Sequence, residues 1–153
     1  MFKHILVPTD GSPLSAAAVH AAVRLAAALG ARVTGLFAAP PATPIVYRDA
    51  LPVGYATPER HAKMIRRAAR AHLAVIERAA QAAGVPCETL SVTSDYPAEA
   101  ILETAGRRGC DLIFMASHSR RGLRGLLLGS QTQKVLAAAK LPVLVYRRSR
   151  ADS

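Results

Sequence analysis

The chain has little of several residue types on which common functions depend. It contains no tryptophan, and aromatic residues make up 5% of its 153 residues. The two cysteines, Cys87 and Cys110, have no CxxC or Cys/His spacing, which disfavours zinc and thioredoxin-like sites and predicts two reduced thiols. No apolar run approaches the roughly 18 residues of a membrane span, and the run after Lys3 is too short for a signal peptide. We therefore expect a cytoplasmic protein.

Acidic residues are also scarce. The sequence has 10 Asp and Glu residues and 20 Lys and Arg residues, which gives a formal net charge of +10. Such a charge suggests nucleic acid as a partner, but the sequence has no segment in which basic residues alternate with aromatic residues that could stack on bases. We expect solvated basic faces and at most weak, salt-sensitive, non-specific association. The residues concerned are Arg60, Lys63, Arg67, Arg70 and the tail 147–150.

Helical and strand patterns alternate along the chain. Apolar runs predict strands at 3–9, 32–38, 87–93, 110–116 and 142–146. Helices are predicted at 13–29, 57–84, 97–107 and 130–140, with Ser12 as N-cap and Gly30 as C-terminal stop of the first. Alternation of this kind predicts one α/β domain over 1–153, with a core at 3–147 and a basic tail at 148–153. Its parallel sheet should be covered on both faces, and the polar alternation of 87–93 indicates a sheet edge.

Five of the ten prolines fall between residues 39 and 58. This predicts a loop of about twenty residues, a length that in compact domains is usually functional or mobile.

The pattern most informative about function lies in the second half of the chain. Residues 115–119 (Met-Ala-Ser-His-Ser) end a predicted buried strand, and 129–132 (Gly-Ser-Gln-Thr) open a helix ten residues later. The first N–H groups of a helix have no intrahelical partner and lie at the positive end of its dipole. A small-residue loop before such an end lets a phosphate approach the backbone.

Several segments together resemble the universal stress protein family over residues 3–147. They are 8–12 (Pro-Thr-Asp-Gly-Ser), 97–101, 117–130 and 142–145 (Pro-Val-Leu-Val). The resemblance implies an open five-stranded parallel sheet of order 3-2-1-4-5, a Rossmann-like arrangement of the adenine nucleotide alpha hydrolase type. Ligands of such sheets bind beside the point where the strand order reverses, so residues 8–10 and 115–118 should meet in one crevice.

The chain departs from the glycine motif of the family. Nucleotide-binding members carry G-x2-G-x9-G-(S/T); here Gly129 and Ser130 match, but Ala116 and Ser119 replace the first two glycines. If the backbone there has positive φ, these residues cost about 1–2 kcal/mol, or roughly one to two decades of affinity. If φ is negative, they cost nothing. The resemblance therefore implies ATP, possibly with Mg²⁺, as the ligand of a stress-response module. The alternative is a protein-interaction member of the same fold without nucleotide.

The resemblance also assigns expected roles to individual residues. Asp10 accepts bonds from ribose hydroxyls or shapes the turn before the first helix, and the backbone near Ala38 meets adenine. Ser130 contacts phosphate, or serves only as a helix cap. The full set of expected nucleotide-binding residues is Pro8, Thr9, Asp10, Ala38, Met115, Ala116, His118, Ser119, Arg120, Gly129, Ser130, Gln131 and Thr132.

Neither a nucleophile with a base and orienter nor a Walker A lysine motif is present in the sequence, and no set of metal ligands is evident. We expect a binding protein whose ATP hydrolysis is at most slow and incidental.

The last strand, with Val143, Leu144, Val145 and Tyr146, lies at a sheet edge in the family order. Its unpaired backbone groups predict a homodimer in which this strand pairs with its own copy.

Overall fold

The computed structural model describes residues 1–39, 57–117 and 128–148. These residues form, in chain order, β1 (His4–Thr9), α1 (Pro13–Leu29), β2 (Arg32–Ala39), α2 (Pro58–Ala82), β3 (Cys87–Thr93), α3 (Pro97–Arg108), β4 (Leu112–Ala116), α4 (Ser130–Ala138) and β5 (Val143–Tyr146). All neighbouring strands pair in parallel, in the order β3-β2-β1-β4-β5. The predicted fold class and strand order are confirmed.

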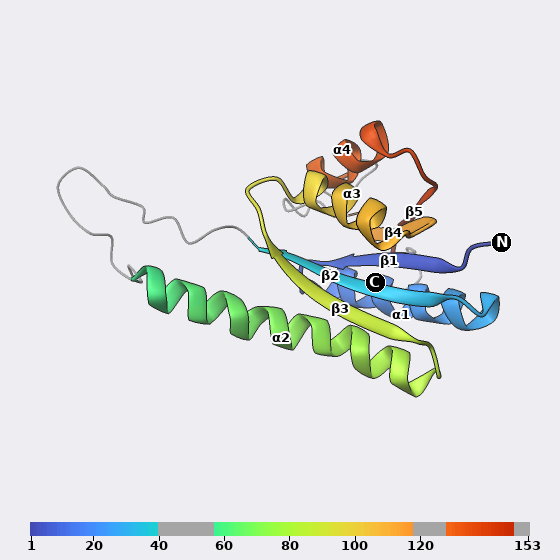
Figure 1. The fold of residues 1–153 in the computed structure, drawn as a ribbon, viewed down its shortest axis with the longest axis horizontal. Helices are drawn as coiled ribbons and strands as arrows, with labels where there is room; N and C mark the ends of the chain where they lie inside the picture. The colour runs from blue at the N-terminus through green and yellow to red at the C-terminus, as the bar shows by residue number, and fades with distance from the viewer. Residues whose placement is uncertain (40–56, 118–127, 149–153) are drawn as a thin grey trace.

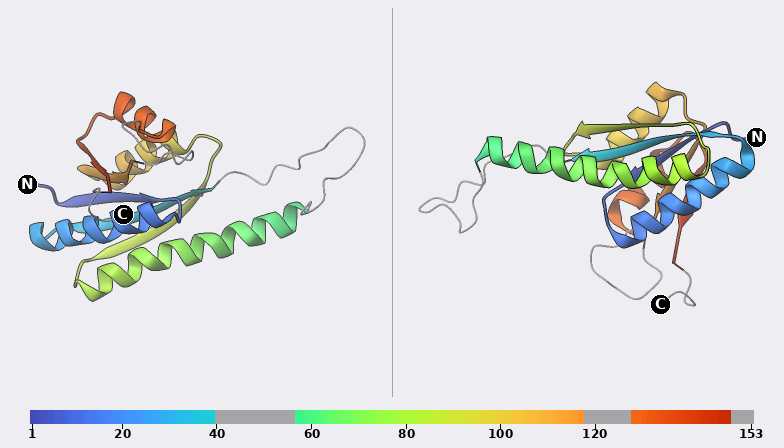
Figure 2. Two further views of the ribbon diagram at one scale, coloured as in Figure 1. Left: turned by 180° about the vertical axis from the view of Figure 1, so that it is seen from behind. Right: turned by 90° about the horizontal axis from the view of Figure 1, so that it is seen from below.

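The sheet is covered on both sides. Figures 1 and 2 show α1 and α2 on one face and α3 and α4 on the other. In β1, Ile5 and Val7 pack into the core under α1 and α2, whereas Leu6 packs into the core on the α3 and α4 side. Because both faces of the central strands are buried, their sequences are continuous apolar runs rather than alternating ones.

The helix ends follow the local sequence signals. The Ser12 side chain accepts a hydrogen bond from the Ser15 N–H at 3.1 Å, and Pro13 begins α1. Gly30, at φ +64°, ends α1 in the left-handed conformation. Thr57 caps α2 by accepting from the Arg60 N–H. Both caps stabilise helix starts through donors that the helix itself cannot satisfy.

Several predicted boundaries were wrong by one or two residues. Strand β4 begins at Leu112 rather than at 110, because the Cys110 N–H donates to the Ala105 carbonyl and closes α3 instead. Helix α4 ends at Ala138 because Ala139 is extended, with ψ 135°. Strand β2 continues to Ala39, where its carbonyl accepts the Ser94 N–H.

Strand β3 pairs only with β2 in the described part of the chain, so its prediction as an edge is confirmed.

Of the predicted loop 39–58, residues 40–56 lie outside the described residues. None of the described helices combines the length and apolar character needed to cross a bilayer.

Candidate functional site

The fold brings the ends of β1 and β4 to one edge of the sheet. These two strands are parallel neighbours, with Leu6 opposite Ile113. Strand β1 leads into α1 on one face, whereas α4, the next described helix after β4, lies on the opposite face (Figure 1). The strand order therefore reverses between β1 and β4, and the carboxyl ends of the strands there form the ligand crevice of sheets of this type.

The turn after β1 is held by its own side chains. The Thr9 hydroxyl accepts hydrogen bonds from the Gly11 N–H at 3.2 Å and from the Ser15 hydroxyl at 2.8 Å. Asp10 Oδ1 accepts from the Ser12 N–H at 2.9 Å. This bond gives Asp10 a turn-shaping role directly after the carboxyl end of β1.

A contact that sequence analysis missed fixes the same turn from outside. Gly11 has φ +80°, and a Cβ placed on it would lie 2.2 Å from Cε1 of His72 in α2. The His72 ring in turn packs against Phe37, with ring centroids 5.3 Å apart. The Asp-Gly pair indicated a turn, but no signal in the sequence links Gly11 to a histidine 61 positions later.

Helix α4 begins differently from α1. Its N-cap is Gly129, whose φ of −59° is an ordinary conformation, and among the described residues no side chain caps the helix. Ser130, the first helical residue, is exposed. The first N–H groups of α4, at the positive end of its dipole, thus have no side-chain cap among the described residues, whereas Ser12 caps the corresponding end of α1.

Two of the predicted site side chains have structural partners. The Thr132 hydroxyl is buried and donates to the Ala116 carbonyl at 3.1 Å. Gln131 Oε1 accepts from the Ala98 N–H, at the start of α3, at 3.2 Å. These bonds join α4 to β4 and to α3 and give both side chains a structural role, and the backbone N–H groups of residues 131 and 132 remain candidates for an anion.

At Ala116 the structure decides between the two alternatives that the sequence left open, in favour of negative φ. No non-glycine residue among those described has positive φ, and Ala116 is an ordinary residue of β4. The backbone there does not require glycine, so alanine carries no conformational cost. Met115 and Ala116 are buried at the end of β4, and Pro8 and Ala38 are half-buried on β1 and β2. His118, Ser119 and Arg120 lie outside the described residues.

A second polar cluster, also missed by sequence analysis, lies at the opposite end of the strands. His4 Nε2 contacts the Thr34 hydroxyl at 2.6 Å, and Thr34 donates to Glu88 at 3.0 Å, which also pairs with Arg108. Since the Thr34 proton goes to Glu88, His4 Nε2 carries a hydrogen and donates it. His4 Nδ1 is then buried without a partner among the described residues.

The titrating groups of this cluster are shifted by their surroundings. Burial, reinforced by the Arg32 guanidinium, lowers the pKa of His4. Partial burial acts to raise the pKa of Asp111, but the N–H groups of His4 and Lys3, at 3.0 and 2.8 Å, outweigh it and hold that pKa below its ordinary value. Burial raises the pKa of the free thiols Cys87 and Cys110 to about 11, so both are protonated at neutral pH.

Nothing in the described ranges gathers three or more His, Cys, Asp or Glu side chains as a metal site would.

Comparison with known proteins agrees with this geometry. The model of the universal stress protein family matches residues 1–147. A universal stress protein of Thermus aquaticus is 37% identical over 147 residues, which is 96% of this chain and 100% of that protein.

Solved structures show the same fold. The hypothetical protein MJ0577 of Methanocaldococcus jannaschii superposes with a TM-score of 0.78 and 26% identity, over 98% of this chain and 99% of that one. A universal stress protein solved in complex with cAMP superposes with a TM-score of 0.68 and 26% identity, over 97% and 98% of the two chains. The family match over nearly the whole chain, together with the reversal of strand order between β1 and β4, shows that this chain belongs to the universal stress protein family.

Proposed function

We propose that the chain binds an adenine nucleotide at the carboxyl ends of β1 and β4, with ATP, accompanied by Mg²⁺, as the form expected in its role as a stress-response module. The observation that carries the proposal is the N-terminus of α4, which has no side-chain cap among the described residues and is held against the carboxyl end of β4 by the Thr132–Ala116 hydrogen bond. The similar universal stress protein solved with cAMP supports an adenine nucleotide as the ligand class.

In this proposal the nucleotide phosphates meet the first N–H groups of α4 and the exposed hydroxyl of Ser130. The ribose lies against the turn at Asp10, and the adenine against the backbone near Ala38. Thr9, Met115 and Ala116 form the floor of the proposed nucleotide site, and the hydrogen bond of Thr132 to Ala116 keeps the start of α4 against this floor. His118, Ser119 and Arg120 complete the set through the family resemblance alone.

Thermal unfolding with ATP and Mg²⁺ tests the proposal. A ligand that binds only the native state raises the melting temperature in a concentration-dependent way. Ser130→Ala should weaken binding by about 1–3 kcal/mol, or roughly 5- to 150-fold, because it removes a charge-assisted hydrogen bond. Ser130→Thr keeps the hydroxyl and should bind like the parent. The absence of any shift at millimolar ATP would favour a member of the family that acts through protein interactions without nucleotide.

We further propose that the chain forms a homodimer through β5. This strand pairs only with β4 in the described part of the chain, and Leu144 is 38% exposed. The carbonyls of Pro142 and Tyr146 accept N–H groups from the β4 side. Since successive residues of a strand direct their backbone groups to opposite sides, Val143 and Val145 direct theirs outward, toward the partner strand.

A further inference from the structure

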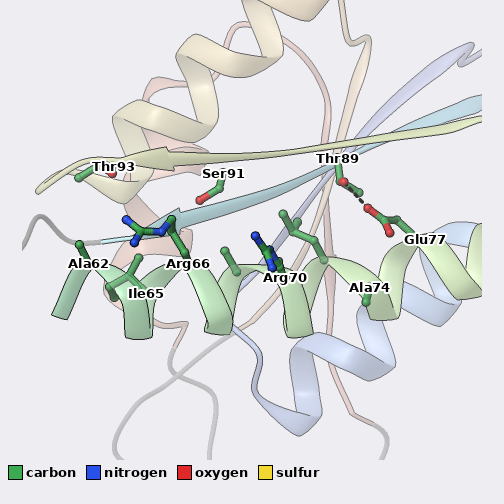
Figure 3. A pocket seen from close by; sticks show the side chains of 11 residues that line it. Ala62, Ile65, Arg66, Arg70, Ala74, Glu77, Thr89, Ser91 and Thr93 are labelled. Carbon is green, nitrogen blue, oxygen red and sulfur yellow. Dashed lines mark hydrogen bonds between the residues drawn. The ribbon is translucent and has the colours of Figure 1, made fainter. Parts of the chain in front are cut away.

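A groove that the proposed nucleotide site does not use runs between α2 and the edge strand β3. Its volume is about 660 Å³, and eight residues of α2 and three of β3 line it. Ile65, Ala69 and Leu73 supply an apolar floor, and Thr89, Ser91 and Thr93 form the wall on the strand side. Figure 3 shows the strand and the helix facing each other across this space.

The backbone of β3 offers hydrogen-bonding groups on the open side of the groove. The Pro86 carbonyl accepts the Val33 N–H, and the Ser94 N–H donates to Ala39, so even-numbered residues of this strand face β2. Residues 87, 89, 91 and 93 therefore direct their N–H and C=O groups away from the sheet, because these directions alternate along a strand. Within the described residues no strand pairs with that side.

The groove has a basic end and a closed end. Arg66 and Arg70, one helical turn apart, both line it, and no carboxylate of the described residues pairs with either. Figure 3 shows Arg66 across from Ser91 and Thr93, and Arg70 farther along the helix, between the positions of Ser91 and Thr89. At the other end Glu77 accepts a 2.5 Å hydrogen bond from the Thr89 hydroxyl, which ties the helix to the strand.

We propose that this groove binds an extended, acidic segment of a partner protein, which adds to β3 as a further strand. The outward backbone groups of β3 supply the main-chain pairing, the usual source of affinity in such complexes. Side chains of the added strand that lie on the α2 face of the sheet meet Arg66 and Arg70, whose guanidinium groups bind carboxylates with two parallel hydrogen bonds. Alternating acidic residues are therefore the recognised feature.

Two features favour this occupant over others. Within the described ranges the groove combines a strand edge that no other strand pairs with and two guanidinium groups without a carboxylate partner, and an acidic polypeptide satisfies both at once. The chain as a whole carries a net charge of +10, which favours approach of an acidic partner.

Fluorescence anisotropy with a labelled peptide tests the proposal. The probe is a seven-residue peptide alternating valine and glutamate, titrated with the full chain at low salt. R66E/R70E should weaken binding at least tenfold more than the matched control R60E/R67E. The control changes the same net charge at two exposed arginines of α2 outside the groove. Equal losses in the two variants would show general electrostatic attraction and overturn the proposal.

The strand edge is tested separately. Ser91→Pro removes an outward N–H without touching the pairing with β2, whereas Ser91→Ala removes only the hydroxyl. We expect at least fivefold weaker binding for S91P than for S91A. The same interaction is tested on the unaltered chain with a probe peptide whose backbone nitrogens are methylated at alternate residues, so that they cannot donate hydrogen bonds to β3. This peptide should bind more weakly than the unmethylated probe by a similar factor. Equal binding of S91P and S91A, or of the methylated and unmethylated probes, would contradict strand addition. Sedimentation showing a dimer that S91P dissociates would instead place a second copy of the chain on β3 and also overturn it.

Discussion

The Thr132 hydroxyl donates a 3.1 Å hydrogen bond to the carbonyl of Ala116, and Thr132 is 1% exposed. This bond joins the first turn of α4 to the last residue of β4. It holds the start of α4 against the end of β4, although the two residues are 16 positions apart.

Thr132→Val keeps the shape of the side chain but leaves the Ala116 carbonyl without its side-chain donor. We expect a loss of about 1–3 kcal/mol in the free energy of unfolding, because a buried polar group loses its partner. Urea denaturation measures this loss. Thr132→Ser retains the hydroxyl and should lose clearly less; equal losses for Val and Ser would show that the hydrogen bond contributes nothing.

Gly11→Ala should destabilise the chain for two separable reasons. Positive φ costs an alanine about 1–2 kcal/mol, and the new Cβ meets the His72 ring. Gly30→Ala is the matched control, since Gly30 also has positive φ but nothing lies within 4 Å of its added Cβ. We expect G11A to be less stable than G30A in urea, and His72→Ala in the G11A background to recover part of the difference. G11A and G30A of equal stability would refute the contact.

The stability of the chain should fall in mild acid because of His4. Its folded pKa lies below the ordinary 6.5, so below about pH 6.5 the unfolded chain binds a proton that the folded chain does not. Arg32 adds to this effect, whereas Glu88, Asp111 and the backbone of Arg108 act against it. Between pH 7.5 and 5.5 the parent should lose more stability than His4→Gln, by at most about 1.4 kcal/mol per pH unit. Parallel pH profiles of the two proteins in urea denaturation would rule out this role for His4.

Val145→Pro tests the homodimer. Its N–H points away from β4, so proline there should remove a bond between subunits while the domain stays folded. Light scattering should report a dimer for the parent and for Val145→Ala, which keeps the N–H, and a monomer for V145P. A parent mass near 16 kDa at tens of micromolar would end the proposal.

Local signals in the sequence were enough to predict most of the fold. Ser12 with Pro13, and Gly30, mark the ends of α1 because capping depends on residues close in sequence. The strand order 3-2-1-4-5 came from the family resemblance, since periodicity predicts strands but not their neighbours.

The contacts that distant segments make were not predictable. Asp111 was predicted within the strand 110–116, yet it precedes β4 and its carboxylate accepts the N–H groups of Lys3 and His4, more than 100 positions away. The Gly11–His72 contact and the His4–Thr34–Glu88 chain likewise depend on how elements pack. A glycine motif records which residue type occurs at a position, but only the backbone conformation shows whether the position requires glycine. Ala116 does not have positive φ, so its position does not require glycine.

The central claim, that an adenine nucleotide binds between β1 and α4, is tested most directly by amide NMR of the labelled chain titrated with ATP and Mg²⁺. The account predicts saturable shifts that are largest at residues 9–12, 115–117 and 129–132, with little change at 65–77 or 89–93. No shifts at millimolar ATP would contradict it. Shifts centred on Arg66 and Arg70 would contradict it equally, because they would place the nucleotide on the basic groove instead.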